Sequence, residues 1–112
     1  MHELGLTQAL VDLAVEAAET NGGTRVTRLV VEIGKLSAVL PAAVRFCFEL
    51  CSAGTVVEGA VLEILEPPGR ATCQACRSEV TLARPYGVCA CGSSDLAWIS
   101  GDEVTLKEME VF

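Results

Sequence analysis

The sequence is poor in basic residues, aromatic residues and histidine. Only 8 of its 112 residues are Lys or Arg, against 15 that are Asp or Glu, and the formal net charge is −7. A chain this acidic lacks the positive surface that supplies most nucleic-acid affinity, and the same charge disfavours binding to anionic membranes. One Trp, one Tyr and three Phe also offer little for base stacking. The sequence therefore predicts neither a nucleic-acid nor a membrane partner.

Long apolar runs are absent as well. Glu, Arg or Gly interrupts every apolar stretch well before the roughly 20 residues that span a bilayer. The first residues show no basic region followed by an apolar run, so no signal peptide is visible and a cytoplasmic location is expected. No G-x-x-x-x-G-K-[ST] phosphate loop occurs in the sequence. If the function requires nucleotide hydrolysis, a partner protein would therefore have to supply it.

What the sequence has is enough apolar material, 51% of its residues, for a core of single-domain size. Apolar residues recur at helical spacing over 4–20, where Asn21-Gly22-Gly23 supplies the stop. Alternating apolar and polar residues predict strands elsewhere, and a proline is well placed to begin a second helix. The expected elements are a helix over 4–20, a strand over 24–33, a helix over 41–52, and strands over 60–66 and 103–111.

The residue pattern and composition change between Pro67 and Ser100, where apolar periodicity weakens and Cys, Gly, Pro and Arg become frequent. We therefore expect an α+β fold: a body with a small three-stranded sheet and two helices, plus an inserted zinc-ribbon-like lobe. The body would comprise residues 1–67 and 100–112, and the lobe residues 68–99.

Four of the six cysteines fall in this lobe, as Cys73-Gln-Ala-Cys76 and Cys89-Ala-Cys91. Two such turns can bring four thiolates around one tetrahedral zinc ion, with Zn–S distances near ~2.3 Å. Four thiolates leave zinc no open position, which favours a structural ion. A thioredoxin-like redox pair at Cys73 and Cys76 is the alternative, but the βαβ setting of that motif is absent.

Cys47 and Cys51 stand apart from this cluster. They lie four residues apart on the apolar face of the expected second helix, where cysteine commonly acts as a small buried hydrophobe. A soft-metal or redox role is the alternative.

The only histidine is His2, between Met1 and Glu3. An N-terminal amine, backbone amide nitrogens and an imidazole can surround one ion in a plane, which suits Ni(II) or Cu(II). Glu3 could add a carboxylate. From spacing alone, however, a terminal histidine is more often solvated and without a role.

Several segments resemble the HypA/HybF family of nickel metallochaperones. They include the opening Met1-His2-Glu3-Leu4, the Phe46-Cys47-Phe48-Glu49 segment and the two cysteine pairs, and also Val31-Glu32-Ile33-Gly34-Lys35-Leu36-Ser37, Val57-Glu58-Gly59-Ala60 and Gly92-Ser93. The resemblance covers essentially the whole chain. This sequence departs from the family pattern at the second cysteine pair, where family members usually carry Cys-x-x-Cys. Cys91 is the expected fourth zinc ligand, with Asp95 as the alternative.

The resemblance implies a carrier rather than an enzyme. Ni(II) would bind at Met1, His2 and Glu3 as transferred cargo, and Zn(II) would bind structurally at Cys73, Cys76, Cys89 and Cys91. The implied partners are a HypB-type GTPase accessory protein and the [NiFe]-hydrogenase large-subunit precursor. The family also serves urease maturation in some bacteria, and its members include monomers and homodimers.

Two other classes of function compete with this one. A zinc-ribbon protein–protein adaptor would use the lobe and leave His2 without a role. An enzyme is disfavoured because the only histidine is terminal, no Ser/His/Asp set is available and the expected zinc site is full.

Overall fold

A computed structural model describes residues 2–112 and divides them into two compact units. The first unit comprises the residues up to Val31, together with 39–64 and 105–112; the second comprises 32–38 and 65–104. Residues 68–99, the expected lobe, lie within the second unit, which also includes 32–38, 65–67 and 100–104. Within residues 2–112, no helix is both long and apolar enough to cross a membrane.

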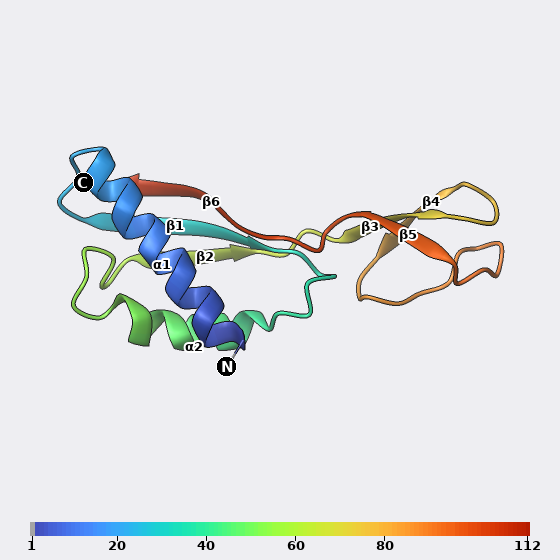
Figure 1. The fold of residues 1–112 in the computed structure, drawn as a ribbon, viewed down its shortest axis with the longest axis horizontal. Coiled ribbons are helices and arrows are strands. Elements are labelled where there is room, and N and C mark those ends of the chain that lie inside the picture. Colours follow the sequence, from blue (N-terminus) through green and yellow to red (C-terminus); the bar gives the residue numbers. More distant parts are fainter. Residues whose placement is uncertain (1) are drawn as a thin grey trace. The chain divides into compact units, whose positions relative to one another are not determined.

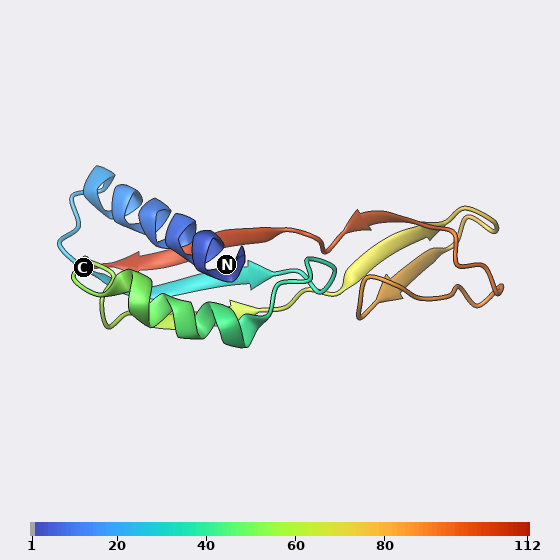
Figure 2. The same cartoon turned by 60° about the horizontal axis from the view of Figure 1, so that its bottom comes forward.

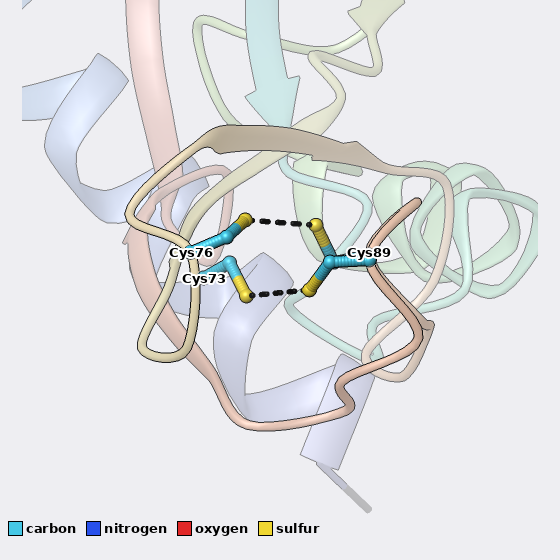
Figure 3. A group of neighbouring side chains, drawn as sticks. Cys73, Cys76 and Cys89 are labelled. Carbon is cyan, nitrogen blue, oxygen red and sulfur yellow. Dashed lines mark hydrogen bonds between the residues drawn. The ribbon is translucent and has the colours of Figure 1, made fainter.

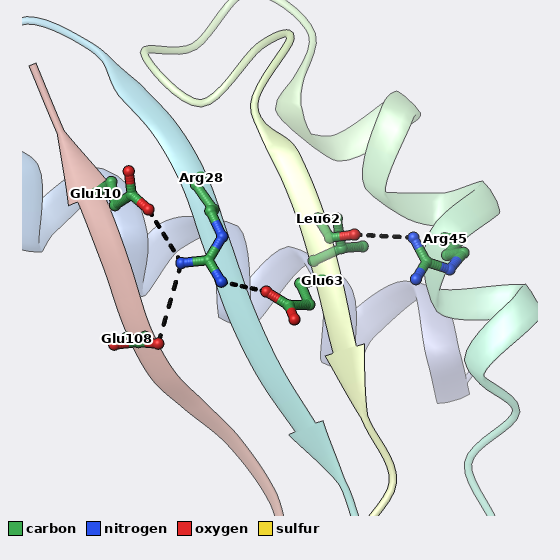
Figure 4. A network of polar contacts seen from close by, with 6 residues as sticks. All are labelled: Arg28, Arg45, Leu62, Glu63, Glu108 and Glu110. Atoms are coloured by element: carbon green, nitrogen blue, oxygen red, sulfur yellow. Dashed lines mark hydrogen bonds and ion pairs between the residues drawn. The ribbon is translucent and has the colours of Figure 1, made fainter.

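The first unit contains both helices and the larger part of three strands that form one sheet (Figures 1 and 2). The strand order is β2-β1-β6. The arrows of β1 and β2 point the same way in Figure 4, and β6 points the opposite way. The expected α+β class is confirmed, with small differences at the ends of the elements. Their bounds are α1 His2–Thr20, β1 Val26–Ile33, α2 Pro41–Ser52, β2 Val61–Leu65 and β6 Val104–Val111.

The sequence signals that end α1 and begin α2 act as expected. Gly22 adopts a positive φ of 71°, and the Gly23 N–H donates to the Ala18 carbonyl at 2.9 Å. These groups satisfy carbonyls that the end of a helix otherwise leaves without partners. Pro41 occupies the first turn of α2, where its missing N–H costs nothing.

The core of the first unit lies where α1 and α2 pack on the sheet. Its buried residues come from both helices, from β1 and from the segment before β2: Val11, Ala14, Ala18, Val26, Leu29, Phe48, Cys51 and Val57. Cys47 is also buried, at 2% exposure. The prediction that Cys47 and Cys51 serve as core residues is confirmed.

One arginine ties the three strands together through their side chains (Figure 4). Arg28 on β1 contacts Glu63 on β2, and its Nη1 lies 3.0 Å from Glu110 and 4.0 Å from Glu108 on β6. Glu63, chiefly through its hydrogen bond, and Glu110 raise the pKa of Arg28. Since the cluster is partly exposed, it does more to neutralise neighbouring carboxylates than to stabilise the fold.

The second unit is built on another small antiparallel sheet, of order β4-β3-β5. Gly69 pairs with Leu82 on one side, and Cys73 pairs with Leu96 on the other. The sequence pattern did not predict these short strands, because the buried residues of β3 are small and β4 and β5 bury few side chains. Their bounds are β3 Gly69–Cys73, β4 Glu79–Leu82 and β5 Leu96–Ser100.

Three segments of the second unit are hydrogen-bonded where they meet. The N–H groups of Gly34, Lys35 and Leu36 donate to the carbonyls of Glu103, Pro67 and Gly101 at 2.8–3.0 Å. Leu36 is buried there with Ala71 and Leu82. A Cβ added at Gly34 would overlap the Gly101 carbonyl oxygen, so the close approach requires glycine at this position.

Candidate metal centre

The second unit brings all four lobe cysteines into one group. The sulfur atoms of Cys73, Cys76, Cys89 and Cys91 lie within 4.8 Å of one another. Cys73 ends β3 and Cys76 follows in the next turn, whereas Cys89 and Cys91 lie between β4 and β5. Two close contacts join one pair to the other: Cys73 to Cys91 and Cys76 to Cys89, each at 3.6 Å (Figure 3).

These distances fit a tetrahedral zinc ion. Four Zn–S bonds of ~2.3 Å place the sulfur atoms about 3.8 Å apart. A disulfide would instead require two sulfur atoms to approach to about 2.05 Å, whereas all four thiols are free. The donor set of four sulfurs is also the one that zinc prefers in closed structural sites.

Backbone hydrogen bonds shape both cysteine turns. The Arg77 N–H donates to the Cys73 carbonyl at 2.8 Å, and Arg77 itself has a positive φ of 65°. In the second turn the Gly92 N–H donates to the Cys89 carbonyl at 2.8 Å, with a φ of 95° at Gly92. A left-handed residue after each pair thus turns the chain back, so the shorter Cys-x-Cys pair still presents both sulfurs to the group.

The environment of the cysteine sulfurs makes their acidities unequal. The hydroxyl and backbone N–H of Ser78 hydrogen-bond to Cys76, and with the neighbouring thiols they lower its pKa to about 6. The Ser93 N–H lowers the pKa of Cys91, but the other three thiols outweigh it and raise that pKa to about 11. Four thiolates this close repel one another, and a bound divalent cation would remove that repulsion.

Ser78 and Ser93 are the supporting residues that the sequence analysis missed. The Cys73 N–H donates to the Ser78 carbonyl at 2.9 Å, and the Cys89 N–H donates to the Ser93 carbonyl at 2.8 Å. Each serine follows the second cysteine of its pair by two positions. That repeated Cys-x-Ser spacing is the signal that could have identified them.

Asp95, the alternative fourth ligand, lies close to the turns but not in the group. Among the described residues, the only set of neighbouring metal-ligating side chains consists of the four cysteines. The Asp95 carbonyl instead accepts the Gln74 N–H at 2.9 Å, and its N–H donates to the Ser93 hydroxyl at 3.1 Å. Asp95 thus helps to hold the two turns together through its backbone.

The residues expected to bind nickel belong to the first unit. Met1 lies outside the described residues, and α1 begins at His2. The His2 side chain is 67% exposed and that of Glu3 is 17% exposed, with Nδ1 of His2 3.9 Å from the Glu3 carboxylate. An imidazole and a carboxylate therefore face each other at the start of the helix, and the imidazole is open to solvent.

A family model described as "Hydrogenase/urease nickel incorporation, metallochaperone, hypA" matches residues 1–111. A hydrogenase maturation factor HypA of Trichormus variabilis is 54% identical over 111 residues, covering 99% of this chain and 96% of the relative. A hydrogenase maturation factor HypA of Azotobacter vinelandii is 45% identical over 112 residues, with 99% of each chain covered.

Solved structures agree with the sequence matches. The solution structure of the Ni metallochaperone HypA from Helicobacter pylori superposes with a TM-score of 0.70 at 28% identity. That match covers 97% of this chain and 96% of the other. With the same fold and a sequence match along nearly its full length, this chain belongs to the HypA family of nickel metallochaperones, whose cargo is nickel.

Proposed function

We propose that this chain binds Ni(II) at Met1, His2 and Glu3 and delivers it to the large-subunit precursor of a [NiFe]-hydrogenase. The observation that carries the proposal is the exposed His2 imidazole beside the Glu3 carboxylate at the start of α1. His2 is the only histidine of the chain, so no other imidazole competes for the metal.

The start of a helix suits a ligand set that includes backbone nitrogens. The first four N–H groups of an α-helix have no intrahelical acceptor, so the His2 and Glu3 amide nitrogens can release their protons to solvent and bind a metal without breaking the helix. The positive end of the helix dipole opposes a cation, and the Glu3 carboxylate offsets that effect. An exposed site also allows a partner to reach the ion and take it.

Zinc in the second unit would have a different role. Cys73, Cys76, Cys89 and Cys91 would hold it, and four thiolates leave no position for a substrate or water. The ion would supply folding free energy to the 68–99 lobe rather than reactivity. We therefore propose that the chain is not an enzyme and that residues 1–67 with 100–112 form its nickel-binding body.

Because the sequence has no phosphate loop, a HypB-type GTPase would supply the nucleotide hydrolysis that accompanies nickel transfer. Delivery to urease maturation proteins is the corresponding alternative. The cytoplasm is the proposed location, where reduced thiols can bind zinc.

The test is a Ni(II) titration against a competing chelator, using zinc-loaded protein with a free native N-terminus. The His2→Gln variant should lose tight nickel binding and keep its zinc. Gln is preferred to Ala because a Met-Ala start invites removal of Met1, which would move the amine. Equal nickel affinity of both proteins would refute the nickel site.

A second candidate is a zinc-ribbon adaptor for another protein. The observation that favours it is the exposure of Tyr86, Val88, Trp98 and Ile99 on the second unit. Large exposed apolar side chains are typical of interaction surfaces. The same titration separates the two functions, since the adaptor does not require His2.

A further inference from the structure

A buried hydroxyl lies one helical turn from the expected nickel ligands. Thr7 on α1 is only 1% exposed, and it is one of two buried polar residues in the described chain. Its Oγ1 donates a hydrogen bond of 2.6 Å to the backbone carbonyl of Glu3. Because packing fixes the Thr7 side chain, this bond ties the Glu3–Leu4 peptide group, directly after the expected ligands, to the core of the first unit.

Two features of the sequence weaken the first turn of α1. The helix begins at His2, and the residue before it in the sequence, Met1, has no side-chain oxygen that could accept a hydrogen bond from the free N–H groups. Gly5 weakens the turn further, since glycine loses more conformational freedom in a helix than any other residue. No atom lies within 4 Å of a Cβ built at Gly5, so packing does not require glycine there. Helix ends of this kind fray.

We propose that Thr7 is a positioning residue for nickel: its hydroxyl holds the His2–Glu3 backbone in the conformation that presents the metal ligands. This inference rests on the proposed nickel site and adds a residue to it. A chelate that uses backbone nitrogens needs consecutive peptide groups in one fixed arrangement. In an ordered turn the conformational entropy of that arrangement is already lost on folding, so metal binding does not have to bear that cost.

Thr20 provides a matched control at the other end of the same helix. Its Oγ1 donates to the Glu16 carbonyl at 2.9 Å, also four residues earlier, but this bond is exposed and lies about four to five helical turns from His2. If Thr7 acted only by stabilising α1, loss of the equivalent Thr20 bond would affect nickel in the same direction.

The experiment titrates Ni(II) against a competing chelator in zinc-loaded wild type, Thr7→Val, Thr7→Ser, Thr20→Val and His2→Gln. Valine keeps the size and branching of threonine and removes only the hydroxyl, so the loss of one hydrogen bond should weaken nickel binding about five- to tenfold. Thr7→Ser should restore wild-type affinity, and Thr20→Val should leave it unchanged.

Two readouts separate positioning from general stability. The visible absorption bands of bound Ni(II) should shift in Thr7→Val at saturation, because the ligand geometry relaxes. Amide exchange at Leu6 and Thr7 should be faster in this variant before metal is added, whereas exchange in the middle of α1 should not change.

Three outcomes would overturn the inference. Nickel binding by Thr7→Val with wild-type affinity and spectrum would do so, as would failure of Thr7→Ser to restore it, or an equal loss in Thr20→Val. In each case the weak binding of His2→Gln would still support the nickel site. Wild-type affinity in His2→Gln would refute the site and the inference together.

Discussion

Cys91 reaches the sulfur group although its pair is one residue shorter than the first. The left-handed backbone at Gly92 turns the chain immediately after Cys91, and the Cys89 carbonyl accepts the Gly92 N–H. The distance from Cys73 to Cys91 consequently equals that from Cys76 to Cys89, at 3.6 Å. At the scale of single residues, the turn at Gly92 compensates for the shorter spacing of the second cysteine pair.

The fourth zinc ligand can be tested with a pair of conservative changes. Cys91→Ser should weaken zinc binding by more than the roughly 10–100-fold that loss of a supporting group costs, because a ligand itself is removed. Asp95→Asn should leave zinc affinity unchanged, since it preserves the backbone bonds of Asp95 to Gln74 and Ser93. Zinc competition with a chromogenic chelator measures both. A loss of zinc in Asp95→Asn together with retention in Cys91→Ser would assign the ligand to Asp95.

At the scale of elements, Cys47 and Cys51 show that helical periodicity alone can predict which side chains are buried. Their spacing on α2 predicts burial, and both side chains are buried. Burial raises the pKa of the Cys51 thiol, and the nearby Cys47 adds to the effect. A protonated thiol in an apolar core is inert, so the helix keeps these cysteines apart from metal chemistry.

The close approach of residues 34–36 to residues 67–69 and 101–103 depends on the glycine at position 34. Gly34→Ala should destabilise the protein by about 1–3 kcal/mol, because its Cβ would overlap the Gly101 carbonyl and neither backbone can move aside easily. Gly5→Ala, which meets no atom, should instead stabilise the protein by up to about 1 kcal/mol. Urea unfolding measures both free energies. Unchanged stability of Gly34→Ala would mean that these segments do not approach as closely as described.

At the scale of the whole molecule, the two units differ in how much core they have. Eight buried residues form one cluster of the first unit, whereas a cluster of the second unit has three, Leu36, Ala71 and Leu82, with Val80 and Leu96 partly buried against it. So small a core cannot offset the chain entropy of its unit, and a structural metal is one of the usual supplements.

Removal of zinc should therefore unfold the second unit selectively. After treatment with a chelator, amide hydrogen exchange should accelerate in β3, β4 and β5, while the amides of α1 and α2 stay protected. Restoring zinc should restore the slow exchange. Equal protection of the three strands with and without zinc would show that the apolar cluster suffices.

Acid should act in the same direction as the chelator. Zinc holds its ligand thiols deprotonated, so their pKa in the folded, zinc-loaded protein lies below the value of about 8.5 in an unfolded chain. The stability they contribute is present above that value and is lost as the pH falls. Zinc affinity measured across a pH series should thus decrease steadily towards acid, and a pH-independent affinity would exclude thiolate ligation.

Much of this protein was determined by local sequence. The periodicity of α1, Pro41 at the start of α2 and the alternation in the main strands predicted the elements of the first unit, because each signal acts within a few residues. The paired cysteines likewise predicted a four-sulfur group, since short spacings restrict where the side chains can lie. The resemblance carried by Met1-His2-Glu3 predicted the family that the comparisons show.

Only the tertiary structure decided the rest. The alternating buried residues of β3 are the small Gly69, Ala71 and Cys73, whereas β4 buries only Leu82 and β5 buries no residue, so pairing between distant segments defines these strands. Leu36 packs with Ala71 and Leu82, more than thirty positions along the chain, which no local pattern encodes. The hydrogen bond from Thr7 to Glu3 is local in sequence, yet its significance comes from the burial of Thr7. Burial is a property of the assembled core, because it depends on which surfaces the folded chain removes from water.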